Sequence, residues 1–309
     1  MRCSNGQQQI LGNDPASSMI GDLGSAPVLV FGGAYSNLRA LQALRARAAA
    51  LGVPPSRVIC TGDVVAYCAE PEETIAAIRD WGCHVVAGNC EQQLALGADD
   101  CGCGFAQGSA CDSLSKGWYA FAAARLSAAS RAWMGQLPNS LWFTYRGFSL
   151  RVVHGGIDRI NRFLFSSQRS LIATELARAR ADVVIAGHAG LPFIRRHRDQ
   201  VWFNPGVIGM PANDGTPDVW YGLIRCTGDG LSFLTQRLTY DHHGAASAMR
   251  KQDYADAYAD ALISGRWPSI DVLPADERAS TGERLQEQEL IVPSPRLSFT
   301  QARRAVAAI

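Results

Sequence analysis

The chain contains four short apolar segments that each end at a glycine beside one polar side chain. The pairs are Gly62-Asp63, Gly88-Asn89, His154-Gly155 and Gly187-His188. Short β-branched runs closed by glycine are typical of buried strands in layered α/β proteins, whose ligands gather at the carboxyl ends of the strands. This pattern constrains the fold strongly, because several strands must deliver a carboxylate, an amide and two imidazoles to one edge.

Strand and helix signals alternate along much of the chain. Strands are predicted at 27–31, 58–60 and 84–87, with helices at about 38–51, 71–81 and 91–97. This spacing indicates parallel βαβ units. Further on we predict helices at 113–125, 128–136 and 168–179, strands at 140–145, 148–153 and 182–186, and antiparallel segments at 191–197, 200–204 and 219–236. We therefore expect an α/β protein with two mixed sheets in a four-layer αββα sandwich.

The composition limits the kind of protein. The 309 residues are 47% hydrophobic and 18% charged with a net charge of +1, which favours a soluble globular chain and gives no field for binding nucleic acid. Nine cysteines are an odd number, and the first 26 residues lack a signal-peptide pattern, so we expect a reducing, cytoplasmic setting. No apolar run is long enough for a transmembrane helix, so no membrane partner is expected.

The same signals divide the chain into regions. Residues 1–25 are rich in Gly, Ser, Asn and Gln and are predicted to be a disordered leader. The main domain is expected to span 26–240, with a cysteine-containing loop and helical insert at 98–136. Residues 241–309 carry one amphipathic helix at about 252–263 and then a tail that we expect to be flexible and available to a protein partner.

Each polar residue at a strand end also has a structural interpretation. Asp63 and Asn89 could cap helices or form turns, and each histidine could be a satisfied core residue. Four such side chains at four strand ends are harder to explain by packing. A carboxylate oxygen, an amide oxygen and two imidazoles suit a divalent ion such as Mn²⁺, Fe²⁺ or Zn²⁺. We therefore predict a metal site formed by Asp63, Asn89, His154 and His188.

Five sequence blocks, taken in order, resemble those of calcineurin-like metallophosphoesterases. The blocks are Thr61-Gly62-Asp63-Val64-Val65-Ala66-Tyr67, Gly88-Asn89-Cys90-Glu91, Val153-His154-Gly155, Ala186-Gly187-His188 and Asn204-Pro205-Gly206-Val207-Ile208-Gly209-Met210-Pro211. The resemblance is to the small bacterial phosphodiesterase branch and covers about residues 27–236. It implies the same four-layer sandwich, a divalent metal, no organic cofactor and a phosphoester substrate.

The departures from the family pattern fall at three positions. The family places Asp-x-His after its first strand and ends its last block in Gly-His-x-His, whereas this chain has Gly33, Tyr35 and Gly190 there. In the family these positions serve one of two metals, together with the shared aspartate. The other metal's ligands match Asp63, Asn89, His154 and His188. The resemblance therefore implies a site for one ion.

Two further residues have hypothetical catalytic roles. Cys90 stands where many relatives have a histidine that protonates the leaving group, and a thiol is a poor but feasible acid. Tyr35 could donate a hydrogen bond to a phosphoryl oxygen, or could simply stack as an aromatic residue. Solvated loops are the default interpretation of Arg159, Arg162 and the Asn213-Asp214-Gly215 turn, although each could reach a phosphoester.

The remaining cysteines have no assigned role in this scheme. Cys101, Cys103 and Cys111 could form a second metal or redox site, but they match no familiar spacing, so free thiols are the simpler interpretation. The predicted function is metal-dependent phosphoester hydrolysis by one-metal activation of water. Two alternatives stay open: a catalytically silent scaffold, for which the retromer subunit related to this family is a precedent, and a metal or thiol redox sensor.

Overall fold

A computed structural model describes residues 16–228, 230–252, 254 and 256–293. The first of its two sheets contains β2 (Val28–Phe31), β3 (Val58–Cys60), β4 (His84–Val85), β10 (Val219–Cys226), β11 (Gly230–Leu238) and β12 (Glu289–Pro293). Its strand order is β12-β11-β10-β2-β3-β4. Strands β2, β3 and β4 are parallel, whereas β10, β11 and β12 extend the sheet with antiparallel pairs. The sheet is mixed, as predicted.

The second sheet contains β1 (Ser17–Asp22), β5 (Ser140–Tyr145), β6 (Phe148–Val153), β7 (Val183–Ile185), β8 (Phe193–His197) and β9 (Gln200–Asn204). Its order is β1-β5-β6-β7-β9-β8, with β6, β7 and β9 parallel. Strands β5 and β6 form the predicted hairpin. Arg146 and Gly147 both have positive φ at its turn, the geometry that a two-residue hairpin favours.

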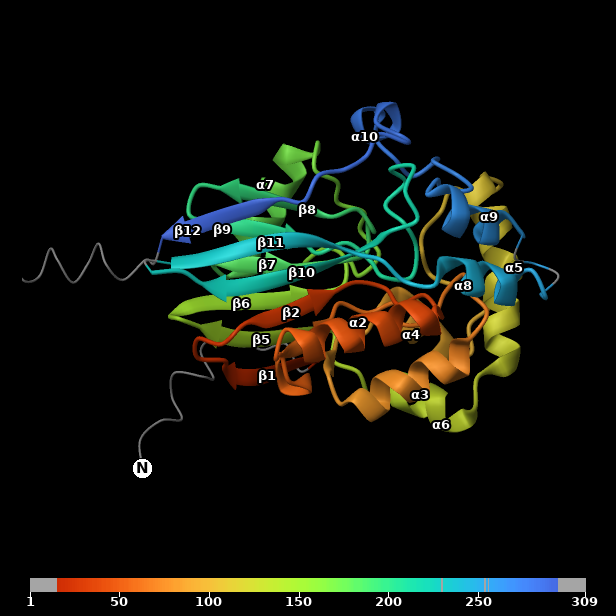
Figure 1. Ribbon diagram of the computed structural model, residues 1–309, viewed down its shortest axis with the longest axis horizontal. Coiled ribbons are helices and arrows are strands. Elements are labelled where there is room, and N and C mark those ends of the chain that lie inside the picture. Colours follow the sequence, from red (N-terminus) through yellow and green to blue (C-terminus); the bar gives the residue numbers. More distant parts are fainter. Residues whose placement is uncertain (1–15, 229, 253, 255, 294–309) are drawn as a thin grey trace, which may run out of the picture.

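Helices cover the outer faces of both sheets (Figure 1). They are α2 (Leu38–Ala50), α3 (Pro71–Trp81), α4 (Asn89–Leu96), α5 (Ala110–Arg125), α6 (Ala128–Met134), α7 (Arg169–Ala179), α8 (His242–Met249), α9 (Asp256–Ser264) and α10 (Ala275–Ala279), with a short 3₁₀ turn at Pro55–Arg57. Leu41 and Leu44 of α2 pack with Phe31 of the first sheet, whereas Leu176 of α7 packs with Trp202 of the second.

A separate apolar cluster fills the space between the two sheets. Val28 and Val30 of β2 share it with Leu150 and Val152 of β6 and with Phe203 of β9. The alternating side chains of β2 therefore face the helices on one side and the other sheet on the opposite side. The layers are helix, sheet, sheet and helix, which confirms the predicted αββα sandwich. Within the residues that the structure describes, no helix has the length and apolar character to cross a membrane.

Two segments that we expected to be flexible are instead strands. Residues 17–22, placed in the disordered leader, form β1 and pair with β5 in parallel. Residues 289–293, placed in the flexible tail, form β12 and pair with β11. In both cases the edge of a sheet supplies backbone hydrogen bonds that a single extended segment cannot make by itself. The other parts of the expected leader and tail, 1–15 and 294–309, lie outside the described residues.

Candidate metal centre

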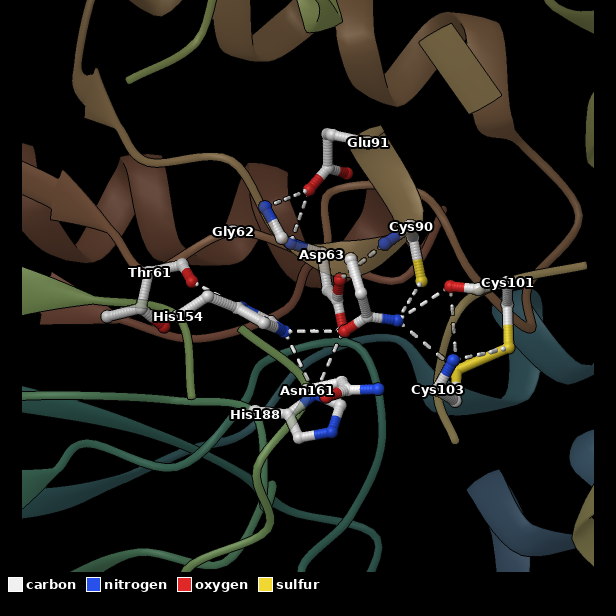
Figure 2. Close-up of polar contacts among 12 residues, drawn as sticks. Thr61, Gly62, Asp63, Cys90, Glu91, Cys101, Cys103, His154, Asn161 and His188 are labelled. Atoms are coloured by element: carbon white, nitrogen blue, oxygen red, sulfur yellow. Dashed lines mark hydrogen bonds and ion pairs between the residues drawn. A yellow bond between two sulfur atoms is a disulfide. The ribbon is translucent and has the colours of Figure 1, made fainter. Parts of the chain in front are cut away.

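Asp63, Asn89, His154 and His188 meet where the carboxyl ends of the two sheets come together. Asp63 follows β3, and Asn89 begins α4 shortly after β4. His154 follows β6 and His188 follows β7, so each sheet contributes two of the four residues. All four are at least nine-tenths buried. Figure 2 shows Asp63, His154 and His188 pointing toward one another.

The backbone at Asp63 adopts a conformation that few non-glycine residues take. Its φ is +55°, in the left-handed region where aspartate and asparagine are the best tolerated side chains. The loop also passes very close to Gly88, where a Cβ would lie 2.2 Å from Asp63 Oδ1. Only glycine at 88 lets the two loops touch. A buried aspartate with a left-handed backbone at the end of a strand is typical of a functional site.

Four side-chain atoms converge at this point. His154 Nε2 lies 3.0 Å from Asn89 Oδ1, 2.9 Å from His188 Nδ1 and 3.1 Å from Asp63 Oδ2. His188 Nδ1 lies 3.9 Å from the same carboxylate oxygen. In the described part of the chain, Asp63, His154 and His188 are the one group of three His, Cys, Asp or Glu residues whose ligand atoms come this close together, all within 4.8 Å.

Hydrogen bonds outside the cluster fix which atoms face inward. His154 Nδ1 donates to the Thr61 carbonyl at 2.6 Å, so the neutral imidazole presents a lone pair at Nε2. Asn89 Nδ2 donates to the Cys101 carbonyl at 2.8 Å, which leaves its Oδ1 facing the histidines. The inward atoms of Asp63, Asn89 and neutral His154 are therefore all acceptors. Acceptors crowded together need a shared cation or proton between them.

The electrostatics of the cluster depend on Asp63. Burial opposes its ionisation, yet His154 and His188 hold the pKa of its carboxyl well below the usual range. Burial also opposes protonation of His154, but Asp63 and the Thr61 carbonyl raise the pKa of that imidazole. For His188 burial dominates and lowers the pKa. Asp63 thus brings a fixed negative charge, and His188 a neutral nitrogen.

Glu91 lies at the site, although the sequence analysis did not predict a role for it. It is fully buried, and its carboxylate accepts from the backbone N–H of Asp63 at 2.7 Å (Figure 2), of Gly88 at 2.8 Å and of Val65 at 3.3 Å. Burial first, and then the charge of Asp63, raise the pKa of Glu91 to about 7. A glutamate at the third position of a helix that begins after glycine is a capping signal, and this spacing could have identified it.

Aromatic rings lie at or against Tyr35, Gly33 and Gly190, the three positions where the resemblance implies that ligands are missing. The Tyr35 ring lies over Gly33, so that a Cβ at Gly33 would stand 2.2 Å from Tyr35 Cε1. At Gly190 a Cβ would meet the Trp267 ring at 3.5 Å, and the φ of Gly190 is +73°. The rings of Tyr35 and Trp267 therefore fill the space beside these two glycines.

The cysteines do not take the places that we expected. Cys101 and Cys103 are joined in a disulfide, and the Cys111 thiol donates to Ser269 Oγ at 3.3 Å. Cys101 and Cys103 are therefore not the free thiols that we preferred, and a disulfide sulfur is not a thiolate ligand for a metal, whereas a redox role for these cysteines stays a hypothesis. Cys90 is buried and does not line the cleft described below, and burial followed by the charges of Asp63 and Glu91 raises its pKa. Its thiol is therefore badly placed to protonate a leaving group.

Of the residues that we considered for substrate contact, Arg162 and the 213–215 turn bind other parts of the chain. Arg162 pairs with buried Glu175 at 3.4 Å, and Arg159 is exposed. The carboxylate of Asp214 pairs with Arg237. Asn213 Oδ1 accepts from the Trp267 backbone N–H at 2.8 Å. The 213–215 turn therefore anchors the C-terminal segment, which itself reaches the site.

A cleft with an empty volume of about 740 Å³, its mouth included, opens onto Asp63 and His188. Its walls contain several residues that the sequence did not single out for the site: Tyr67, Phe105, Phe163, Met210, Tyr258, Trp267 and Val272. Tyr258 lies on α9, and Trp267 follows it in the chain. A Trp-Pro pair after an amphipathic helix is a weak signal, and only the docking of this segment reveals its role.

The paired mixed sheets and the ligand cluster at their carboxyl ends define the fold class of the metallophosphoesterases. The family model described as the calcineurin-like phosphoesterase superfamily domain matches residues 35–228. The chain therefore belongs to the calcineurin-like phosphoesterase superfamily. Comparison with curated protein sequences gave no match.

Two solved structures share this fold over most of the chain. A metallophosphoesterase from Sphaerobacter thermophilus is 18% identical with a TM-score of 0.62, and a hypothetical protein from Pyrococcus horikoshii OT3 is 16% identical with a TM-score of 0.67. Each comparison covers 78% of this chain and 99% of the other chain. At this identity the likeness establishes the fold alone.

Proposed function

We propose that this protein is a phosphoester hydrolase in which Asp63, Asn89, His154 and His188 hold one divalent ion. The observation that carries the proposal is the convergence of four ligand atoms, with His154 Nε2 between 2.9 and 3.1 Å from the other three. Two nitrogens and two oxygens suit Mn²⁺, Fe²⁺ or Zn²⁺. Family membership supplies the reaction class, phosphoester hydrolysis.

The residues around the cluster favour this assignment. A ligating histidine usually donates its second ring nitrogen to a carbonyl, as His154 does to Thr61. The Asn89 amide is fixed in the same manner by the Cys101 carbonyl. Both side chains are thus oriented before any ion arrives. Such preorganisation lowers the cost of binding.

The chain's own groups have separate parts in the reaction. Asp63 neutralises part of the charge of the ion, and Glu91 fixes the Asp63 loop through the Asp63 N–H. An ion held here would supply Lewis-acid polarisation of a phosphoryl oxygen and activation of water. Tyr35 lines the cleft, and its hydroxyl has no hydrogen-bond partner in the described part of the chain, so it is free to donate to a phosphoryl oxygen. Burial and the charge of Asp63 raise the pKa of Tyr35, which keeps this donor protonated.

A single ion fits the site better than two. The Tyr35 ring covers Gly33, and the Trp267 ring lies beside Gly190, so an aromatic ring rather than a carboxylate or imidazole lies nearest to each of these glycines. The described residues hold one group of three ionisable ligands rather than two. We therefore expect one ion for each chain.

Metal titration of the purified protein tests the site. After chelation, Mn²⁺ or Zn²⁺ added back should bind at one ion per chain by calorimetry. Asp63→Ala and His154→Ala should weaken binding by at least about 100-fold, because even the outer partners of ligands contribute about 10- to 100-fold. Asp99→Ala, at an exposed position, is the matched control and should bind like the parent. Equal affinity in Asp63→Ala and the parent would refute the assignment.

Turnover separates a hydrolase from a silent scaffold. With Mn²⁺, the parent should hydrolyse an aryl phosphoester, and Asn89→Ala and His188→Ala should lose this activity. A parent that binds metal but shows no turnover above these two variants would identify a binding protein on this fold instead of an enzyme.

A further inference from the structure

Aromatic rings dominate the walls of the cleft beside the candidate metal centre. The rings of Tyr35 and Tyr67 meet edge to face with centroids 4.8 Å apart, and Tyr67 and Tyr258 lie 4.9 Å apart. A second group reaches the site itself, because the Phe163 ring lies 4.2 Å from His188 and 6.2 Å from Phe105. These rings come from loops and helices far apart in the sequence, so the tertiary fold gathers them at one place.

The C-terminal segment completes this wall. The backbone N–H of Trp267 donates to Asn213 Oδ1 at 2.8 Å, and its indole Nε1 donates to the Pro211 carbonyl at 2.7 Å. Both hydrogen bonds fix the indole beside Gly190, next to His188 in the cleft lining. A rigid aromatic surface of this kind suits a planar or apolar group, because stacking adds to the burial of apolar area.

The cleft also lacks the cations that usually bind phosphate dianions. Among the described residues that line it, none is lysine or arginine. Two arginines adjoin lining residues in sequence: Arg162 is engaged by Glu175 at 3.4 Å, and Arg266 is exposed. One divalent ion beside the Asp63 carboxylate would bring a net charge of +1 to the site. This charge matches one negative charge on a bound phosphoester and leaves a second one unpaired in an apolar cleft.

The polar groups on the walls are neutral donors. The hydroxyls of Tyr35, Tyr67 and Tyr258 have no hydrogen-bond partner within the described chain, and none of them is a buried orphan, so they are available to a ligand. A phenol is a neutral donor at neutral pH, because its ordinary pKa is about 10. Neutral donors can hydrogen-bond to a phosphoryl oxygen, but they bring no positive charge. They therefore suit a monoanion better than a dianion.

We propose that the cleft recognises a monoanionic phosphodiester in which one ester group is planar and aromatic, with that group among the rings of Tyr67, Phe163 and Trp267. The inference rests on the proposed function, since it assigns the substrate class of the same site. In the reaction, a water oxygen forms a bond to phosphorus and the bond from phosphorus to the aryl oxygen breaks. One proton of the water passes to the solvent and the other to the departing aryl oxygen, so the products are a phosphomonoester dianion and a phenol.

Equilibrium binding tests the charge and the aromatic group separately. Mn²⁺-loaded protein is titrated by calorimetry with methyl phenylphosphonate, with phenylphosphonate at a pH where it is a dianion, and with methyl methylphosphonate. Methyl phenylphosphonate should bind at least about tenfold tighter than either other compound, a difference that one aromatic contact can supply. Equal or tighter binding of phenylphosphonate or methyl methylphosphonate would overturn the inference.

Substitutions in the cleft wall test whether the preference for the aryl compound arises from these aromatic residues. Trp267→Ala should weaken the binding of methyl phenylphosphonate about tenfold and leave Mn²⁺ affinity unchanged, and Trp133→Ala on α6, outside the cleft lining, should change neither. If Trp267→Ala does not fold, Tyr258→Phe keeps the ring, removes one donor and should weaken both methyl phosphonates several-fold. An unchanged preference for the aryl compound in folded Trp267→Ala, or unchanged affinity for both methyl phosphonates in Tyr258→Phe, argues against the proposal.

The two proposals fail in different ways. If the proposed function is wrong, Asp63→Ala leaves Mn²⁺ binding intact or no phosphoester is hydrolysed. If only the substrate class is wrong, the protein binds Mn²⁺ through Asp63 and hydrolyses p-nitrophenyl phosphate at least as efficiently as bis(p-nitrophenyl) phosphate.

Discussion

At the scale of single residues, Glu91 holds the loop that carries Asp63. Its carboxylate accepts three backbone N–H groups, from Asp63, Val65 and Gly88, in a fully buried position. A carboxylate suits this place because it accepts hydrogen bonds at both oxygens, whereas an amide would turn its NH₂ toward one of these donors. The central residue of the site thus depends on a neighbour that touches none of the four converging atoms.

Glu91→Gln should therefore destabilise the protein and weaken metal binding together. One or more buried N–H groups lose their acceptor, at a cost of about 1–3 kcal/mol in the free energy of unfolding. The displaced Asp63 loop should lower Mn²⁺ affinity by about 10- to 100-fold. Denaturant unfolding and calorimetry measure the two effects, with exposed Asp99→Asn as the control. Parent-like stability in Glu91→Gln would show that the three hydrogen bonds contribute little.

Tyr35 and Gly33 are in close contact, so we expect the effects of substituting them on stability to be coupled. A Cβ at Gly33 would stand 2.2 Å from the Tyr35 ring, so Gly33→Asp alone should cost about 1–3 kcal/mol through overpacking. Combining it with Tyr35→His should recover at least about 0.5 kcal/mol relative to additivity, because the smaller ring leaves room. A double-mutant cycle by denaturant unfolding measures this coupling.

The same pair tests the count of metal ions. Gly33→Asp and Tyr35→His together with Gly190→His should raise the binding from one ion to two, as the resemblance to the family implies. Gly190 has a φ of +73°, so its substitution adds backbone strain of about 1 kcal/mol. A folded triple variant that still binds one ion would show that these positions do not correspond to the second set of ligands.

At the scale of elements, the junction of α3 and α6 depends on one carboxylate. Glu72, in the first turn of α3, accepts from Ser127 N at 3.0 Å, Ser127 Oγ at 2.7 Å and Ser130 Oγ at 2.8 Å. Ser127 is the N-cap of α6, so the carboxylate also lies at the positive end of that helix. Burial opposes ionisation, but these hydrogen bonds lower the pKa of Glu72.

The contribution of Glu72 should depend on pH in a defined direction. Because its folded pKa is depressed, it stabilises the protein above its unfolded pKa of about 4.3, and this stabilisation is lost as the pH falls through the folded value. Glu72→Gln should cost about 0.5–1 kcal/mol near neutral pH, a modest amount for a solvent-accessible site, and little at acidic pH. Unfolding at several pH values measures the difference, with exposed Glu73→Gln as the control. A cost that does not change with pH would contradict this account.

Local signals predicted several elements accurately. The predicted helix 71–81 coincides with α3, where Pro71 begins the helix and left-handed Gly82 ends it. The predicted strands 140–145 and 148–153 coincide with β5 and β6. Strands β1 and β12 were missed because their hydrogen bonds come from distant strands, β5 and β11. Neither segment has the apolar alternation by which a strand is recognised.

At the scale of the whole molecule, the C-terminal segment contributes both to a sheet and to the wall of the cleft. Through β12 it extends the first sheet, and through Tyr258 and Trp267 it lines the cleft beside Asp63 and His188. The fold family therefore supplies the ligand cluster, while this chain's own later residues shape what can approach it. Specificity that resides in added segments is common where one fold serves many substrates.

The sequence by itself was enough to select Asp63, Asn89, His154 and His188. Each of these polar residues lies next to a glycine at the end of a short apolar run, and such a run can be recognised without the tertiary structure. The sequence also predicted the αββα layers, since alternating helices and strands leave few other arrangements. Only the tertiary structure decided that Glu91 supports Asp63, that Cys101 pairs with Cys103, and that Trp267 closes the cleft. Those relations join residues through space, and no local preference of the chain encodes which distant side chains will meet.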